Sequence, residues 1–386
     1  MESLVLRILF TAFSMFWDVL WPLLLGFILS AIIQAVVSKQ KIASLLGGNS
    51  LANISLATLF GAASSSCSYA AVALARSLFQ KGASFTAAMV FEIASTNLVF
   101  ELGLILFVLL GWQFVVAEFL GGLLMIGILV VIFRLTLSQN LIGSARRYAE
   151  KGLLGRMEGH AAMDMSISTK GNFWQRLMSS DGLSAVSNYF VMDIAAVWVD
   201  IVVGLLIAGT VTVIVPNAFW QMFFFKDSPI VSFVVGPLIG PLIAIISFVC
   251  SVGNIPLAAV LWEKGMSFGG VISFVFADVL VVPILDIYRK YYGWRVAGYI
   301  LLTFYLTIAI TGYGVEGIFS FFHAIPTPQT VSFISQGISW NYTSWLNIFF
   351  VLVTLLLSYR FVSRGGMSML SEMEKPESHK HRHSHK

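Results

Sequence analysis

Charged residues are scarce in this chain of 386 residues, and their scarcity excludes most classes of protein. Asp, Glu, Lys and Arg make up only 11% of the sequence, whereas soluble globular proteins carry about 25%. Hydrophobic residues make up 58%, and the mean hydropathy is +0.87. This balance excludes a soluble enzyme, a disordered chain and a coiled coil. It predicts an all-α polytopic membrane protein, because the apolar runs are continuous and do not alternate with period two as in a transmembrane β-barrel.

Cysteine and the usual catalytic motifs are also rare or missing. Two cysteines in the whole chain exclude a disulfide framework. The sequence has no G-x-x-x-x-G-K-[ST] loop and neither a Ser-His-Asp nor an H-E-x-x-H arrangement. We therefore expect no ATP-driven pumping within the chain, no enzyme activity and no cofactor. The formal net charge is +4, and the basic residues lie in loops and at the C-terminus, so we expect no nucleic-acid partner.

Apolar stretches long enough to cross a bilayer, which takes about 20 residues, recur along the chain. They predict about nine spans, two of them re-entrant or broken. The first span is expected to remain as an anchor, because no small-residue cleavage site follows it. The predicted spans are Met15–Val37, Leu51–Phe79 (interrupted), Phe85–Leu110, Trp112–Leu135, Val186–Val213, Ile230–Trp262 (interrupted), Phe268–Ile287, Val296–Tyr313 and Leu346–Val362.

A long polar segment divides these spans into two groups. We predict a first transmembrane half over residues 1–136, a polar loop over 137–185, a second transmembrane half over 186–363 and a basic, His-rich tail over 364–386. Basic residues in the loop and in the tail place both in the cytoplasm by the positive-inside rule. An even number of crossings must then separate them, but the predicted spans give five. One element is therefore miscounted, and the apolar stretch Ala218–Phe225 is our candidate for an extra re-entrant piece.

An internal repeat is the strongest pattern in the sequence. When the chain is shifted by 183 residues, Ser64–Leu102 aligns with Ser247–Leu285 without a gap, and 14 of the 39 paired residues are identical. A shared apolar composition explains why Leu and Ala match in the two segments. It does not explain why the C-S pair and the K-G-x-S-F motif fall at the same positions of both segments. Both cysteines of the chain, Cys67 and Cys250, occupy the same position of the repeat. Repeated halves are typical of secondary transporters, which bind their substrate near the membrane midplane where the repeats meet.

Small polar residues inside the repeated spans are our candidates for the substrate site. Unwound backbone at membrane depth survives only where protein or a water-filled cavity surrounds it. If a pseudo-two-fold axis relates the halves, Cys67 and Cys250 should both face one central cavity, where thiols suit a soft solute. The alternative is that these small residues only allow close packing. The candidate substrate-binding residues are Ser64, Ser66, Cys67, Ser68, Ser247, Cys250, Ser251 and Asn254.

Carboxylates within the spans form a second group of candidates. A carboxylate in hydrocarbon is either protonated or paired, which makes it a candidate proton carrier. Glu92, Asp200 and Asp278 are therefore our candidates for proton or ion coupling. The alternative is a structural role, with a partner such as Arg76 or a backbone hydrogen bond.

Histidine and methionine gather outside the spans. Soft ligands of this kind can bind Cu(I) or a similar ion. Their flexible spacing without cysteine does not define a metal site, so no metal ligand is assigned. The residues concerned are Met157, His160, Met163 and Met165 in the polar loop and His379, His381, His383 and His385 in the tail.

The repeated segments resemble the family of predicted permeases that includes the organoarsenical efflux permeases. The likeness rests on Gly61–Ser68, Lys81–Phe85, Ala94–Asn97, Ser247–Pro256, Lys264–Phe268, Phe276–Asp278, Pro283 and Tyr288–Gly293. It covers both membrane halves but neither the loop nor the tail. The resemblance implies a membrane permease, and members of the family that export trivalent organoarsenicals are expected to use cysteine at the transport site. Tyr69 follows Ser68 where the family frequently has a second cysteine, which argues against a mechanism that takes two thiols from one motif.

These observations leave three interpretations of the function. The leading one is a multi-pass cell-membrane permease that exports a small thiophilic solute, such as a trivalent arsenic compound or a soft metal species, in exchange for protons. The second is a permease for an unrelated small solute, in which the cysteines only pack. The third is a non-transporting membrane scaffold or metal-handling factor that acts through the loop and the tail. The expected partners are the solute and the lipid bilayer. The sequence does not decide between a monomer and a homo-oligomer.

Overall fold

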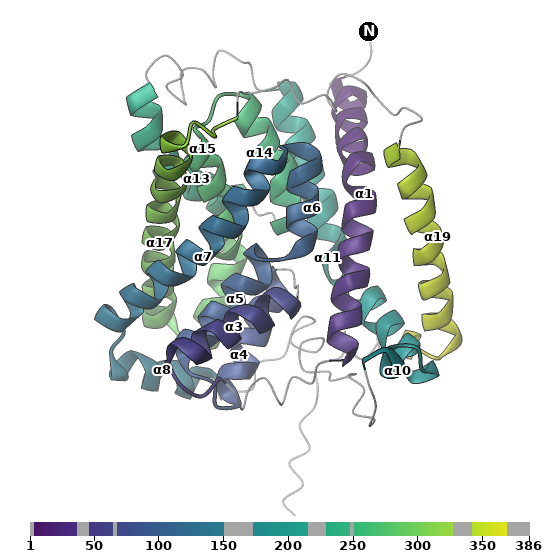
Figure 1. Ribbon diagram of the computed structural model, residues 1–386, viewed down its shortest axis with the longest axis horizontal. Coiled ribbons are helices and arrows are strands. Elements are labelled where there is room, and N and C mark those ends of the chain that lie inside the picture. Colours follow the sequence, from purple (N-terminus) through teal and green to yellow (C-terminus); the bar gives the residue numbers. More distant parts are fainter. Residues whose placement is uncertain are drawn as a thin grey trace, which may run out of the picture.

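Helices account for all the regular secondary structure in the residues that the structure describes, so the prediction of an all-α protein is confirmed. The computed structural model describes residues 4–36, 46–64, 68–149, 173–214, 229–247, 251–326 and 342–368. Its helices are α1 (Leu4–Val36), α3 (Leu51–Ser64), α4 (Ser68–Gln80), α5 (Phe85–Asn97), α6 (Phe100–Leu109), α7 (Trp112–Thr136), α8 (Gln139–Ala149) and α10 (Phe173–Leu177) (Figure 1). They continue with α11 (Ser180–Ile214), α13 (Pro229–Ser247), α14 (Ser251–Glu263), α15 (Phe268–Phe276), the 3-10 helix η1 (Ala277–Leu280), α16 (Val282–Tyr292), α17 (Trp294–Phe321) and α19 (Tyr342–Ser363).

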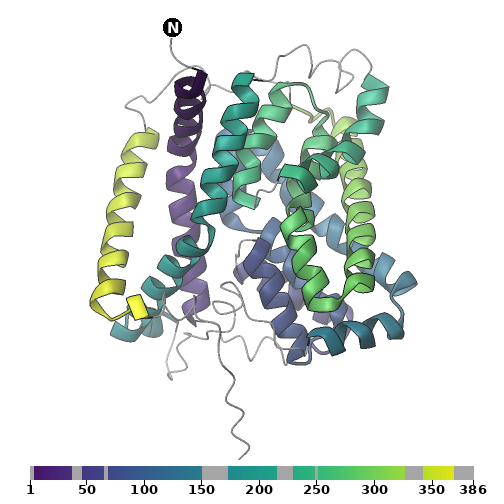
Figure 2. The same cartoon turned by 180° about the vertical axis from the view of Figure 1, so that it is seen from behind.

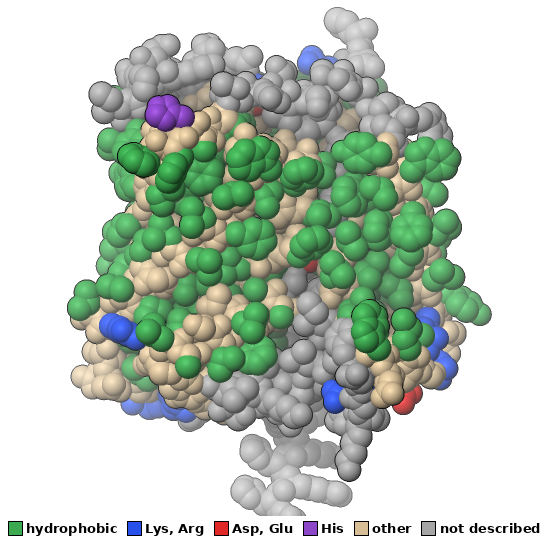
Figure 3. Space-filling model, viewed as in Figure 1, with side chains coloured by type: hydrophobic (Ala, Val, Ile, Leu, Met, Phe, Trp, Pro, Cys, Tyr) green, Lys and Arg blue, Asp and Glu red, His purple; other side chains and the backbone are tan. Residues whose placement is uncertain are grey.

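Several of these helices are long and apolar enough to cross a membrane. Among the described residues, Phe85–Leu109, α7, α17 and α19 each meet that requirement, and two bent helix pairs raise the number to six if each pair is one span. One of these pairs joins Phe268–Leu280 to α16 with a bend of 42°. Apolar side chains cover the middle of the molecule (Figure 3), as contact with lipid requires. The chain is thus a polytopic membrane protein.

Basic side chains gather at one end of the molecule, which we call the basic end. They include Arg134 in the last turn of α7, Arg146 and Arg147 in the last turn of α8, and Arg360 in the last turn of α19. Figure 3 shows Lys and Arg side chains chiefly along its lower edge. Helix α8 lies at this end against α16 and α4. The molecule therefore has the charge asymmetry that the positive-inside rule describes.

Each of the two interrupted spans is a hairpin of two helices. In the first hairpin, α3–α4, the Ser84 amide just after α4 donates to the Leu46 carbonyl just before α3 at 2.9 Å. In the second hairpin, α13–α14, Gly236 of α13 lies against Ser267, which follows α14. Both hairpins pack on the helix that follows them, α3 and α4 on α5, and α13 and α14 on α15. Each interruption is therefore a reversal of the chain.

Aromatic contacts show that the two hairpins open toward opposite ends. Phe79 of α4 packs edge-on against Tyr292, the last residue of α16, with 6.3 Å between ring centroids. Trp262 of α14 packs edge-on against Phe114 at 5.2 Å. Phe114 lies in the first turn of α7, a helix of 25 residues that reaches the basic end only at its other terminus. Accordingly, α4 lies toward the basic end and α14 toward the opposite end (Figures 1 and 2).

The K-G-x-S-F motif makes the same turn at the end of both hairpins. Gly82 and Gly265 have φ angles of +109° and +102°, in the left-handed region that favours glycine. The amide of the next residue donates to a carbonyl near the end of the preceding helix. The Ala83 amide donates to the Leu78 carbonyl at 3.0 Å, and the Met266 amide donates to the Leu261 carbonyl at 3.1 Å. The serine that follows accepts a hydrogen bond from the first turn of the next helix. The motif therefore closes each hairpin and begins the helix on which that hairpin packs.

The second hairpin accounts for the odd number of predicted crossings. Helix α19 runs opposite to α11, because Arg360 near the end of α19 donates to the carbonyl of Ser180 at the start of α11. The other full-length segments that the structure describes in this half are α15 with α16, and α17, so the described helices make four crossings between the loop and the tail (Figure 1). The excess element is Ile230–Trp262, which returns to the end from which it came. Ala218–Phe225, our candidate for the miscounted piece, lies outside the described residues.

Helix α3 packs closely on α5 through Gly61, and this contact gives a first prediction. A Cβ atom at Gly61 would lie 2.5 Å from the Phe91 carbonyl oxygen and 2.8 Å from the Ala94 Cβ. Because these atoms belong to a packed helix, we expect Gly61→Ala to lower the free energy of unfolding by about 1–3 kcal/mol. Gly127→Ala is the matched control, since Gly127 has open space around it. Thermal melting of both variants in detergent is the measurement, and equal stabilities would contradict this packing.

Candidate functional site

The starts of α4 and α14, which we call the tips of the two hairpins, meet inside the molecule at three polar side chains. Ser68 and Ser251 are the first residues of α4 and α14, and their hydroxyl oxygens lie 2.8 Å apart. The Ser68 hydroxyl donates to Asp278 Oδ2 at 2.6 Å, and the Ser251 hydroxyl donates to the same oxygen. All three side chains are buried. These residues, which we call the tip cluster, were all predicted, and the structure brings them together from three separate elements.

Asp278 reaches the tips because its helix is interrupted there. Helix α15 ends at Phe276, the 3-10 helix η1 carries Asp278, and α16 begins at Val282 with Pro283 in its first turn. Proline fixes its φ angle and lacks an amide proton, so it suits the start of a helix and cannot continue the previous one. The break thus places a carboxylate on a turn of the chain instead of on the side of a continuous helix.

Asp278 also lies at the starts of two helices. The first turn of a helix has free amide groups and a partial positive charge, which favour a nearby anion. Because Ser68 begins α4 and Ser251 begins α14, the carboxylate of Asp278 lies at both starts at once. Its second oxygen, Oδ1, has no hydrogen-bond partner in the described part of the chain. The Oδ1 atom of Asp278 can therefore accept a proton or a hydrogen bond from a polar group of a solute.

The other predicted substrate-binding residues surround the tips or lie outside the described chain. The Ser247 hydroxyl donates to the Ala244 carbonyl at 2.8 Å and lies 3.4 Å from Asn254 Oδ1, and Asn254 is fully buried. The Ser64 hydroxyl donates to a carbonyl one turn earlier in α3 at 2.9 Å. These hydroxyls hold the helix ends next to the tips. The remaining predicted residues, Ser66, Cys67 and Cys250, lie outside the described residues.

The predicted coupling carboxylates have different environments. Glu92 of α5 is fully buried and accepts a hydrogen bond from the hydroxyl of Tyr288 on α16. The hydroxyl of Ser95 donates to the backbone carbonyl of Glu92 at 2.9 Å and does not bond to the Glu92 carboxylate. Glu92 and Asp278 are close enough for their charges to interact. Asp200 lies within α11, but its side chain is outside the described part of the structure.

Arg76, the alternative partner for these carboxylates, has another role. Its Nη2 donates to the Ala149 carbonyl at the end of α8 at 2.8 Å, and its guanidinium lies 4.3 Å from the centre of the Tyr291 ring. Gln80, one turn further along α4, also donates to the Ala149 carbonyl. Cationic and polar donors at this position satisfy the free carbonyls at the end of a helix. Arg76 thus attaches the first hairpin to α8 at the basic end.

Two buried carboxylates were not predicted from the sequence. Glu118, six residues after the start of α7, is fully buried, and neither of its oxygens has a hydrogen-bond partner among the described residues. Glu316 of α17 is also buried and packs against Gly269 at the start of α15, and its Oε2 has no hydrogen-bond partner among the described residues. An acidic residue in an apolar run was the available signal for Glu118. For Glu316 the predicted span was too short, since α17 continues to Phe321.

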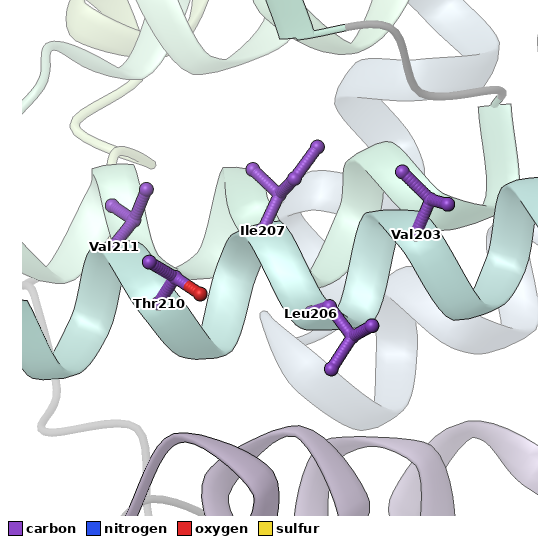
Figure 4. Close-up of a pocket in the computed structure, with 5 residues that line it drawn as sticks. All are labelled: Val203, Leu206, Ile207, Thr210 and Val211. Carbon is purple, nitrogen blue, oxygen red and sulfur yellow. The ribbon is translucent and has the colours of Figure 1, made fainter. Parts of the chain in front are cut away.

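A hollow elsewhere in the described structure lies apart from the tip cluster, and the described ranges contain no candidate metal site. A hollow of about 260 Å³ on α11 is lined by apolar side chains and Thr210, and none of the tip residues lines it (Figure 4). No group of three metal-ligating side chains occurs in the described ranges. The methionines and histidines of the polar loop and the tail lie outside those ranges.

Comparisons with known proteins agree with this architecture. Residues 5–317 match the protein family described as "Predicted permease". The chain belongs to this permease family. The protein named "Putative permease Rv2963" from Mycobacterium tuberculosis (strain ATCC 25618 / H37Rv) is 54% identical over 338 residues, which cover 88% of this permease and 83% of the relative. No solved structure matches the permease. The resemblance seen in the sequence is thus confirmed at the level of the family.

Proposed function

We propose that this permease is a secondary transporter whose solute binds between the two hairpin tips. The observation that supports this most is the contact of Ser68, Ser251 and Asp278 between hairpins that enter from opposite ends. Transporters commonly present polar groups to a solute at helix breaks near the middle of the membrane. If one hairpin moves away from the tip contact, the centre opens to one end only. If first one hairpin and then the other moved in this way, the centre would open to each end alternately.

The two transmembrane halves, residues 1–136 and 186–363, are in this proposal inverted repeats. The 183-residue shift that aligns the sequences also pairs Phe79–Phe85 with Trp262–Phe268, whose ring centroids are 5.4 and 6.1 Å apart. These equivalent pairs lie at opposite ends of the molecule. The polar loop 137–185 and the tail 364–386 fall outside the repeat, and we assign them no part in the transport core.

The solute, in this proposal, is small and thiophilic, such as a trivalent arsenic compound or a soft metal species. Cys67 and Cys250 directly precede the two serines of the tip cluster. Consecutive Cα atoms are about 3.8 Å apart, so each half supplies a thiol within one residue of the tip contact. Thiols bind soft ions and metalloids, while the serine hydroxyls and the Asp278 carboxylate suit hydroxyl groups on the same solute.

We further propose that the solute leaves the cell as protons enter, and that Asp278 couples the two movements. The basic end faces the cytoplasm in this arrangement, and the permease is a multi-pass protein of the cell membrane. An ionised carboxylate is a stronger hydrogen-bond acceptor than a carboxylic acid. Protonation of Asp278 from the opposite end would therefore weaken its bonds to both tips. The tips could then separate and release the solute to that end.

Uptake into proteoliposomes tests the function with a matched pair of solutes. We expect methylarsonous acid, in which arsenic is trivalent, to enter several times faster with a pH gradient than without one. Methylarsonic acid, its pentavalent counterpart, should enter no faster than into protein-free liposomes, because pentavalent arsenic does not bind thiols directly. Equal uptake of both would favour a permease for an unrelated solute. No flux for any solute of a broad panel would contradict transport and favour a scaffold.

A further inference from the structure

We propose that Glu118 is a proton carrier of this permease, and that Glu118, Asp278 and the Glu92–Tyr288 pair form the path of the coupled proton between the two ends. The proposal rests on the proposed transport function and deepens it. It identifies the groups through which a proton reaches the tip cluster and leaves it.

Glu118 is a carboxyl group without a visible structural purpose. Its side chain is 0% exposed, and neither oxygen has a hydrogen-bond partner in the described part of the chain. It lies about 9 Å along α7 from the start of that helix. A buried carboxyl group without a partner destabilises the fold unless it is protonated, and an apolar residue of similar size would serve packing better. An exchangeable proton explains why such a group is found here.

Glu118 lies on α7 near the helix break that carries Asp278. The charge of Glu118 interacts with that of Asp278, as does the charge of Glu92. One turn after Glu118, Gly121 of α7 packs against the ring of Phe276, the last residue of α15 before η1. Asp278 therefore has ionisable neighbours on α7 (Glu118), on α5 (Glu92) and on α16 (Tyr288), besides the two tip serines.

These groups lie in order between the two ends of the molecule. Phe114, one turn before Glu118, belongs to the aromatic contacts at the opposite end, where its ring is 4.8 Å from that of Phe268. Tyr292, one turn after Tyr288, belongs to the contacts at the basic end. Glu118 thus lies on the side of the tip cluster toward the opposite end, and Tyr288 with its partner Glu92 on the side toward the basic end. A proton would pass from Glu118 to the tips and on to Glu92.

The arrangement favours protons over a metal ion and limits leakage. In the described ranges, no three acidic, histidine or cysteine side chains are close enough to hold one metal ion. Outside the tip cluster, the Tyr288 hydroxyl is the only group among the described residues that bonds directly to a carboxylate of the path. Because no hydrogen bond joins the three carboxyl groups to one another, a proton passes only when hairpin movement or water connects them. Proton transfer would then depend on the same movement that exposes the solute.

The variant Glu118→Gln tests the proposal, because glutamine keeps the size and polarity but carries no exchangeable acidic proton. We expect uptake of methylarsonous acid driven by a pH gradient to fall at least tenfold. Exchange of labelled for unlabelled methylarsonous acid at equal pH should change less than twofold, because exchange moves no net proton. Glu316→Gln is the matched control, since Glu316 is a buried carboxyl group that packs against Gly269 at the start of α15 and lies outside the proposed path, and it should leave both rates unchanged.

Each outcome separates this proposal from the proposed transport function. Unchanged driven uptake in Glu118→Gln would overturn the role of Glu118, and so would equal loss of exchange and driven uptake in a stably folded variant. If the unmodified permease itself moves no methylarsonous acid, the transport proposal fails for that solute. Infrared spectroscopy then tests Glu118 alone: the carbonyl band of protonated carboxyl groups should shift in D2O and lose intensity in Glu118→Gln. A band that neither shifts nor changes would overturn the proposal.

Discussion

Replacing Asp278 by asparagine should reduce proton-driven transport about a hundredfold while the permease stays folded. The carboxylate accepts hydrogen bonds from both tip serines, and bonds to a charged acceptor contribute about 1.5–3 kcal/mol each. Loss of about 3 kcal/mol in total corresponds to a factor of about one hundred. Asparagine keeps the size of the side chain and can still accept from Ser68 or Ser251, so the tips should assemble. It cannot exchange the acidic proton on which the proposed coupling depends.

A nearby carboxylate provides the control for this variant. Asp286 of α16 is partly exposed and forms salt bridges with Arg289 at 2.6 Å and Lys290 at 2.8 Å. Asp286→Asn removes a negative charge from the same segment but does not touch the tips, so transport should stay within a factor of two. Initial rates of methylarsonous acid uptake at a fixed pH gradient are the measurement. Asp278→Asn with the same rate as Asp286→Asn would contradict the coupling role.

Most of the helices of this fold could be predicted from the sequence, but the direction of the chain at the hairpins could not. Continuous apolar runs gave the spans, and the K-G-x-S-F motif marked the turns at Gly82 and Gly265. Ile230–Trp262 is long enough to cross the membrane, and its composition does not distinguish a crossing from a reversal. The reversal depends on contacts between distant residues, such as the Ser84 amide with the Leu46 carbonyl in the first hairpin. Such contacts leave no periodic signal.

The candidate site was predicted as separate residues and assembled only by the structure. Ser68 and Ser251 align under the 183-residue shift, and the structure places their hydroxyl groups in contact. Asp278 is different, because the equivalent residue of the first half is Ser95. A carboxylate that serves both tips therefore comes from one half only. The 183-residue shift cannot reveal this, since it compares each residue with its equivalent and not with its neighbours in space.

That asymmetry gives the two halves different tasks in the proposed cycle. The tips supply matched hydroxyl groups, and the second half alone supplies the central carboxylate at Asp278. The first half supplies the buried acids on either side of it, Glu92 on α5 and Glu118 on α7. A solute that binds equally to both halves can thus be moved by a proton that follows an ordered path through them.

The second large effect is expected from the two cysteines. Cys67→Ser and Cys250→Ser should each reduce uptake of methylarsonous acid at least about tenfold, which corresponds to a loss of about 1.4 kcal/mol in binding. Serine has nearly the same shape as cysteine, but its hydroxyl oxygen is a hard donor that holds a soft metalloid poorly. Each substitution also places a hydroxyl group beside Ser68 or Ser251, where hydroxyl groups already occur, so the fold should tolerate it.

The double variant decides whether the thiols bind the solute or only pack. Because Cys67 and Cys250 are the only cysteines of the chain, the double variant contains no thiol at all, and its melting temperature reports any packing role directly. We expect a nearly unchanged melting temperature together with loss of uptake. Full uptake in the double variant would refute thiol binding. Loss of uptake in only one single variant would show that one half alone supplies the thiol, as one half alone supplies Asp278.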